Sequence, residues 1–151
     1  MITRPRAPCH PMALDRARKE YWLRYANQLA GLMGLGHFEW VLLDNPTKCA
    51  AEIEFKDYQH VGQVQLRGDF DSQPPEWQRD TMVHEILHAH FMDIDQTVED
   101  MTTPRPPWAP PAEWSHFCRQ LLAAHLAAEE FIVSDITRAW CKTLPLPPVD
   151  E

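Results

Sequence analysis

The spacing of hydrophobic residues changes along the chain, and this change constrains the fold more than any other feature. Residues 12–33 carry apolar side chains at the period of an amphipathic helix, and Gly34 and Gly36 end that pattern. Three short strand-like segments enriched in β-branched residues follow: 38–43, 49–55 and 61–67. Apolar and polar side chains alternate clearly within residues 61–66. The sequence therefore predicts an α+β fold that contains a small, mostly antiparallel sheet.

Prolines indicate where the later elements begin and end. Pro75 suits the first turn of a helix, which we expect to run over residues 75–92. The segment 93–114 contains five prolines and is predicted to be a long surface loop. A last helix is predicted over residues 112–142. The two terminal segments are expected to be a loose arm and an extended tail: 1–11 and 143–151.

Size and composition exclude several classes of protein. A chain of 151 residues, 44% hydrophobic and 24% charged, is expected to form one domain over residues 1–151. The formal charge of −8 disfavours general nucleic-acid binding, because neutralising phosphates requires clustered lysine and arginine. No apolar run has the length of a membrane span or of a secretory signal, and the four cysteines form no CxxC pair. We therefore expect a cytoplasmic protein that binds neither nucleic acid nor membranes, and its oligomeric state stays open.

Residues 84–88 read His-Glu-Ile-Leu-His, an HExxH sequence inside the predicted helix 75–92. Histidines at positions i and i+4 project from one face of a helix and can share a metal ion. Neutral imidazoles suit Zn²⁺, and Glu85 could then act on a water molecule at the metal as a general base and later as an acid. The plainer alternative is a histidine-rich helix whose side chains are exposed or hydrogen-bonded in the core.

A catalytic zinc usually takes three protein ligands, so a third ligand should come from elsewhere in the chain. The predicted last helix offers Glu129, Glu130 and His125. Glu129 lies on the apolar stripe of that helix, where a carboxylate is costly unless it is paired or bound to a metal. We therefore expect His84, His88 and Glu129 to be the ligands, with Glu130 or His125 as alternatives.

The HExxH helix, the preceding short strands and the later helix with "EEFIV" at residues 129–133 together resemble the zincin metallopeptidases. More narrowly, the chain is similar to minimal gluzincin-like domains of phage and bacterial genomes. The resemblance implies a zinc-dependent peptidase of a bacterial or phage-infected cell that cleaves a peptide or protein substrate. It implies His84, His88 and a glutamate as zinc ligands and Glu85 as the catalytic residue.

The resemblance also implies that the strand before the active-site helix binds an extended substrate along its edge, here through Val64, Gln65 and Leu66. The chain departs from the thermolysin-type pattern, which has an aspartate four residues after the ligand glutamate. Val133 follows Glu129 at that distance, and Ser134 follows Glu130.

Two other functions compete with the peptidase. The first is a catalytically inactive, metal-binding interaction protein of a phage or mobile element. The second is a domain whose zinc is purely structural and closed by four ligands, such as His84, His88, Glu129 and His125.

Residues near the motif have candidate supporting roles. The acidic residues Asp93, Asp95, Glu99 and Asp100 are expected to be solvated, or one of them holds a ligand histidine in place. His90 is expected to have a surface or core role, because the helix turns it away from the metal face. Trp108 and Trp114 are expected to anchor the proline-rich loop or to form a lid over the cleft.

Overall fold

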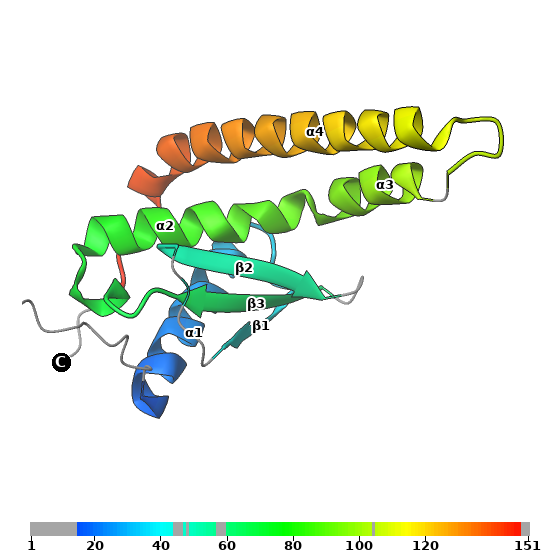
Figure 1. Cartoon of the computed structure of the whole chain (residues 1–151). Coiled ribbons are helices and arrows are strands. Elements are labelled where there is room, and N and C mark those ends of the chain that lie inside the picture. Colours follow the sequence, from blue (N-terminus) through cyan, green and yellow to red (C-terminus); the bar gives the residue numbers. More distant parts are fainter. Residues whose placement is uncertain (1–14, 44–46, 48, 57–59, 104, 149–151) are drawn as a thin grey trace, which may run out of the picture.

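The computed structural model describes residues 15–43, 47, 49–56, 60–103 and 105–148, and it shows an α+β arrangement of four helices around a three-stranded mixed sheet (Figure 1). The helices are α1 (Arg16–Leu32), α2 (Pro75–Leu87), α3 (Met92–Thr102) and α4 (Pro111–Trp140). The strands are β1 (Glu39–Leu42), β2 (Ala51–Lys56) and β3 (Val61–Leu66). The predicted arm 1–11 and the end of the predicted tail, 149–151, lie outside the described residues.

Local signals explain where α1 and α2 begin and end. The Asp15 side chain caps α1 by accepting a hydrogen bond from the Arg18 backbone N–H at 2.8 Å. Gly34 follows the helix with φ +79°, a conformation that glycine adopts without steric cost. Pro75 is the first residue of α2, as the sequence predicts.

The prediction of a mostly antiparallel sheet is wrong. The strand order is β1-β3-β2, with β3 parallel to β1 and antiparallel to β2. Strand β3 lies between β2, its antiparallel neighbour, and β1, which pairs with its other edge in the parallel direction. Alternation within each strand predicts which side chains face the core, but it does not predict which strands are neighbours.

The prediction of one long loop over residues 93–114 is also wrong. The helix 75–92 is divided by a 3₁₀ turn over His88–His90, and α3 then occupies Met92–Thr102. All five prolines of the segment come after α3, so they restrict only its second half. The first half, "DIDQTVEDMTT", contains neither proline nor glycine and is compatible with a helix.

The core lies between α1, α2 and the sheet. Trp22 of α1 is fully buried and packs edge-on against Phe70, with ring centroids 4.9 Å apart. From α2, Met82, Val83 and Ile86 reach the same core. This packing fixes one face of α2 and leaves the opposite face, which carries His84, for other contacts.

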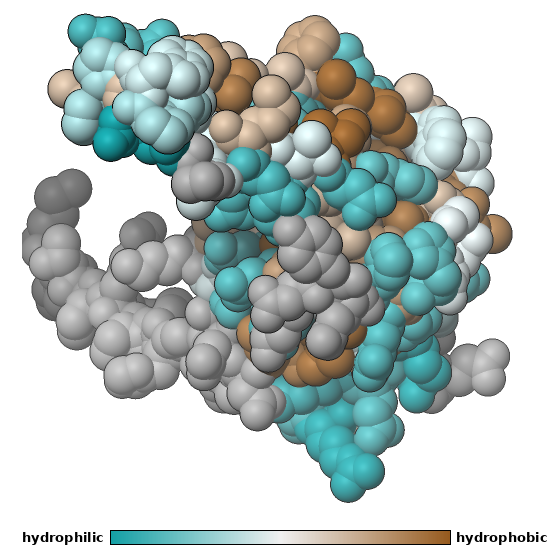
Figure 2. Space-filling view, turned by 90° about the vertical axis from the view of Figure 1, so that its right-hand side faces the viewer, coloured by the Kyte–Doolittle hydropathy of each residue, from teal (hydrophilic) through white to brown (hydrophobic). Residues whose placement is uncertain are grey.

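Helix α4 packs with its C-terminal part on α2 and with its N-terminal part on α3, so the α3–α4 hairpin projects past the sheet (Figure 1). Apolar side chains interrupt the hydrophilic surface in the upper part of Figure 2, where these two helices lie. Exposed apolar residues of α3 and α4 include Met101, Leu126 and Phe131. None of the helices in the described part of the chain is both long and apolar enough to span a membrane.

The two tryptophans lie at different places in this region: Trp108 is in the proline-rich connection between α3 and α4, and Trp114 is in the first turn of α4. The indole N–H of Trp114 donates to the Thr102 carbonyl at 3.3 Å, and its ring lies 5.5 Å from that of Phe117. Trp108 is 80% exposed. Trp114 therefore anchors the connection to the end of α3, as one of the two sequence-based alternatives expects.

Replacing Gly62 by alanine is expected to destabilise the protein by about 1–3 kcal/mol. A Cβ at Gly62 would lie 2.6 Å from Cε3 of Trp40, a buried ring on the neighbouring strand that cannot move without disturbing the core. Chemical denaturation measures the change in unfolding free energy. Gly31→Ala is the control, because a Cβ there meets nothing within 4 Å. Equal stability of the two variants would contradict this packing.

Candidate metal centre

The HExxH sequence covers the last turn of α2 and the first residue of the 3₁₀ turn that follows, so it is helical as predicted. His84 and His88 are one turn apart, and their ring centroids are 5.1 Å from each other. Both rings are partly exposed, at 22% and 23%. The histidines therefore share one face of α2 and are open to a ligand from outside the helix.

Glu130 of α4 meets both histidines. Its Oε1 lies 3.2 Å from Nε2 of His84, and its Oε2 lies 3.6 Å from Nε2 of His88. Among the described residues, these three form a group whose donor atoms could hold one metal ion. Donors bound at 2.0–2.1 Å to a tetrahedral metal are separated by about 3.3 Å, so the spacing and the chemistry of the donors both fit a metal.

The structure places Glu129 differently from the sequence-based expectation. Glu129 is buried, with 5% exposure, and its Oε1 is hydrogen-bonded to Nδ1 of His88 instead of joining the Nε2 atoms. Glu130 is rotated by about 100° around the helix and reaches the open face, where it is 58% exposed. The apolar stripe correctly indicates that Glu129 is buried, but the buried carboxylate lies behind His88 and Glu130 takes the place expected for it.

His125, the other alternative ligand, also lies behind the first group. Its Nε2 is 2.5 Å from Oδ1 of Asp95, and these residues form a second group with Glu129. Burial raises the pKa of Glu129 against the opposing hydrogen bond from His88, and the nearby Asp95 carboxylate adds to the rise. Asp95 is thus the member of the acidic run that approaches the histidines.

Glu85 has the environment of a proton-transfer group. Burial raises its pKa to about 7, against the opposing charge of His88. The backbone N–H of Ile53 donates to the carboxylate and links α2 to β2. A carboxyl with a pKa near neutral pH can both accept and return a proton, which general acid–base catalysis requires.

A cleft of about 440 Å³ opens beside His84 and Glu85. Its lining includes Trp77, Asp80, Thr81, Ser134, Thr137 and Arg138. Burial lowers the pKa of His84, with Glu130 opposing the shift. A neutral imidazole at the floor of an open cleft is the form of histidine that binds a metal.

Strand β3, predicted to bind an extended substrate through Val64, Gln65 and Leu66, is the central strand of the sheet. Strand β2 pairs with its whole length and β1 pairs with residues 61–64, so both of its edges are already occupied over most of the strand. The free edge beside α2 belongs to β2. Arg67 N–H donates to the Ala50 carbonyl, so in the alternating antiparallel pattern the peptide groups of Ala51, Ile53 and Phe55 face away from β3. The residues of β3 were inferred from their position in the chain, which does not indicate strand order.

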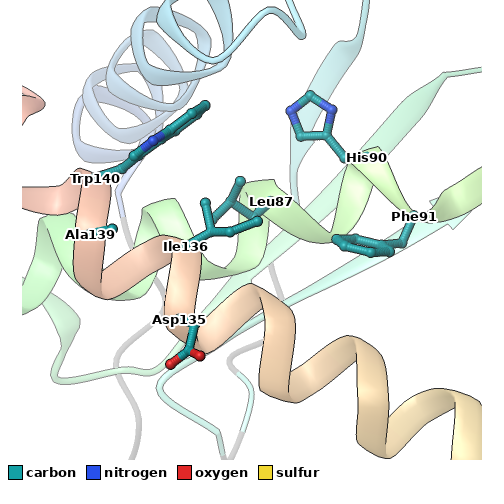
Figure 3. Close-up of a pocket in the computed structure, with 7 residues that line it drawn as sticks. All are labelled: Leu87, His90, Phe91, Asp135, Ile136, Ala139 and Trp140. Atoms are coloured by element: carbon teal, nitrogen blue, oxygen red, sulfur yellow. The ribbon is translucent and has the colours of Figure 1, made fainter.

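A second pocket, of about 460 Å³, lies on the other flank of α4 and is mostly apolar (Figure 3). Leu87, Phe91, Ile136 and Trp140 form its walls. His90 reaches away from the metal group and lies 3.1 Å through its Nε2 from the Met33 carbonyl. His90 is exposed, so the surface role, one of the two alternatives expected from the sequence, is confirmed. The residues that line this pocket include no group of clustered metal donors.

Comparison of the chain with protein-family models, with curated proteins and with solved structures gave no match. The function must therefore be inferred from the site. Ile53, which hydrogen-bonds Glu85, and the cleft residues Ser134 and Arg138 were not identified from the sequence. No local pattern marks them, because each reaches the site through the packing of elements distant in sequence.

Because the pKa of Glu85 is raised, the free energy of unfolding of the metal-free protein should decrease as the pH rises. The folded state holds the Glu85 proton more tightly than the unfolded chain, so stability falls as pH rises from about 4.5 to about 7. Glu85→Gln is expected to stabilise the metal-free protein at pH 8 by roughly 1–2 kcal/mol after allowance for solvent screening, and by much less at pH 4. Urea denaturation at both pH values measures this, and an equal effect at pH 4 and pH 8 would contradict it.

Proposed function

We propose that this protein is a zinc-dependent metallopeptidase with a zincin-like domain. The observation that carries the proposal is the convergence of Nε2 of His84, Nε2 of His88 and the Glu130 carboxylate, with His84 and the neighbouring Glu85 also lining an open cleft. Two imidazoles and one carboxylate are the ligand set of several zinc peptidases, in which a fourth position stays available.

The three proposed ligands are all partly or largely exposed, and His84 lines the cleft together with Glu85, which supports a catalytic metal over a structural one. His125 would have to complete a closed set of four, but it lies against Asp95 behind Glu129. When bound, zinc would polarise the carbonyl group of the substrate and lower the pKa of a water molecule to about 7.

Glu85 performs the proton transfers. It takes a proton from the water that adds to the peptide carbonyl carbon, and it delivers that proton to the amide nitrogen as the carbon–nitrogen bond breaks. The products are a carboxylate and a free amine. The Ile53 N–H orients the Glu85 carboxylate, because a hydrogen bond from a paired strand restricts its rotation.

The edge of β2 is the best candidate for holding the substrate. The outward peptide groups of Ala51 and Phe55 can bind an extended peptide as an added strand, which places its backbone beside α2. Exposed Glu52 and Glu54 on the same strand give the edge negative charge. The substrate segment is therefore proposed to be an extended peptide, and basic side chains would suit this strand.

Mass spectrometry of an unfolded protein mixture, incubated with the zinc-loaded chain, tests the proposal. New peptide termini should form, disappear when a chelator removes the metal, and return when zinc is restored. Absence of new termini from any substrate offered, in a preparation that holds zinc stoichiometrically, would favour the alternative of an inactive metal-binding protein.

A further inference from the structure

Behind the proposed metal ligands lies a second cluster of ionisable side chains that the hydrolytic mechanism does not use. It consists of Asp95 of α3 with His125 and Glu129 of α4. Glu129 has one oxygen on Nδ1 of His88, and its other oxygen lies 4.0 Å from Nε2 of His125. The cluster is therefore continuous with His88.

The distances in this cluster favour hydrogen bonds over a second metal ion. Nε2 of His125 is 2.5 Å from Oδ1 of Asp95, whereas two donors on a tetrahedral metal would be about 3.3 Å apart. A separation of 2.5 Å leaves a proton between the two atoms and no space for a cation. The donors around Glu130 are farther apart, at 3.2 Å and 3.6 Å, which leaves space for a cation between them.

The contact of Glu129 with His88 determines how His88 can bind a metal. An imidazole that offers Nε2 to a metal carries its proton on Nδ1 and donates it to a neighbour, which fixes the ring orientation. Glu129 is that neighbour, and its own position depends on what surrounds it. Asp95 and His125 are the polar residues of the cluster on its far side.

Asp95 is also the link through which α3 reaches the cluster. No residue of α3 is buried, and of its residues only Met92 at its start packs against the hydrophobic core. Asp95 lies in its first turn and is bonded across to His125 of α4. The docking of α3 and the order of the cluster are therefore physically connected.

We propose that Asp95 and His125 are positioning residues that hold the Glu129 carboxylate on His88, so that the docking of α3 and metal binding at His84, His88 and Glu130 stabilise each other. This inference rests on the proposed metal centre. Because coupling between two events is reciprocal, loosening α3 lowers the metal affinity and binding of the metal orders α3.

The test compares Asp95→Ala with Asp93→Ala. Both aspartates lie in the first turn of α3, so both variants lose the same charge near the helix N-terminus, but Asp93 is exposed and outside the cluster. Competition with a chromophoric chelator should show that Asp95→Ala binds zinc about 10-fold or more weakly than Asp93→Ala. Asp95→Asn, which keeps an acceptor oxygen, should recover part of the loss.

A second pair tests the other positioning residue. His125→Phe should weaken zinc binding about as much as Asp95→Ala, whereas His116→Phe, an exposed histidine on the same helix, should not. Circular dichroism of the metal-free variants checks that each is folded.

Hydrogen exchange gives a readout that a merely structural role would not change. Amides of α3 should exchange more slowly after zinc is added to the Asp93→Ala protein, and this protection should be largely lost in Asp95→Ala. Equal zinc affinities and equal protection in the two variants would overturn the inference while leaving the metal centre intact. Binding of two zinc ions per wild-type chain, with one lost in Asp95→Ala, would also overturn it. A wild-type chain that binds no zinc would instead refute the proposed function.

Discussion

Zinc-loaded Glu85→Gln protein is expected to keep its metal and to hydrolyse peptides at least about 100-fold more slowly than the wild type. Glutamine has nearly the same shape and can still accept the hydrogen bond from Ile53, but it cannot take a proton from water. The loss should therefore appear in kcat, with zinc content unchanged. Initial rates on a cleaved peptide, measured beside elemental analysis of the same samples, give both quantities.

Glu76→Gln is the matched control, because Glu76 is an exposed residue in the first turn of the same helix and outside the cleft. Its rate should equal that of the wild type. A Glu85→Gln protein that retained full activity would show that another group transfers the proton, and the role proposed for Glu85 would be withdrawn.

The second large effect is expected when Glu130 is removed. Glu130→Ala takes away a direct donor, so its zinc affinity should fall more than 100-fold, whereas Glu129→Ala removes only the partner of His88 and should cost about 10- to 100-fold. Chelator competition ranks the two variants. Glu113→Ala, a carboxylate removed from the exposed first turn of the same helix, is the control for loss of charge.

The order of these losses separates the two adjacent glutamates. If Glu129→Ala lost zinc completely while Glu130→Ala bound it normally, the sequence-based choice of Glu129 as ligand would be correct. The face of α4 that packs on α2 would then differ from the one described above, in which Glu130 approaches His84 and His88.

Elements whose signals are local could be predicted from the sequence. The alternation in residues 61–66 and the proline at the start of α2 are local signals, and both elements are confirmed. The parallel pairing of β1 with β3 could not be predicted, because it depends on how segments distant in sequence meet. The helix α3 differs from the predicted loop because the prolines, which begin at Pro104, restrict only the residues beside and after them.

The candidate site divides in the same way. His84, Glu85 and His88 could be identified because helical geometry alone brings i and i+4 together. The choice between Glu129 and Glu130 depends on a rotation of about 100°, which the packing of α4 on α2 determines. Burial on the apolar stripe was a correct inference for Glu129, but burial by itself did not indicate whether the carboxylate contacts a metal or a histidine.

Elemental analysis of the purified wild-type chain beside His84→Ala measures whether the proposed metal centre exists. We expect close to one zinc per chain in the wild type, removable by a chelator and restored by added zinc, and almost none in His84→Ala. A wild-type chain that stays free of metal at neutral pH with zinc supplied would show that His84, His88 and Glu130 form an ordinary polar cluster, and the proposed metal centre would be withdrawn.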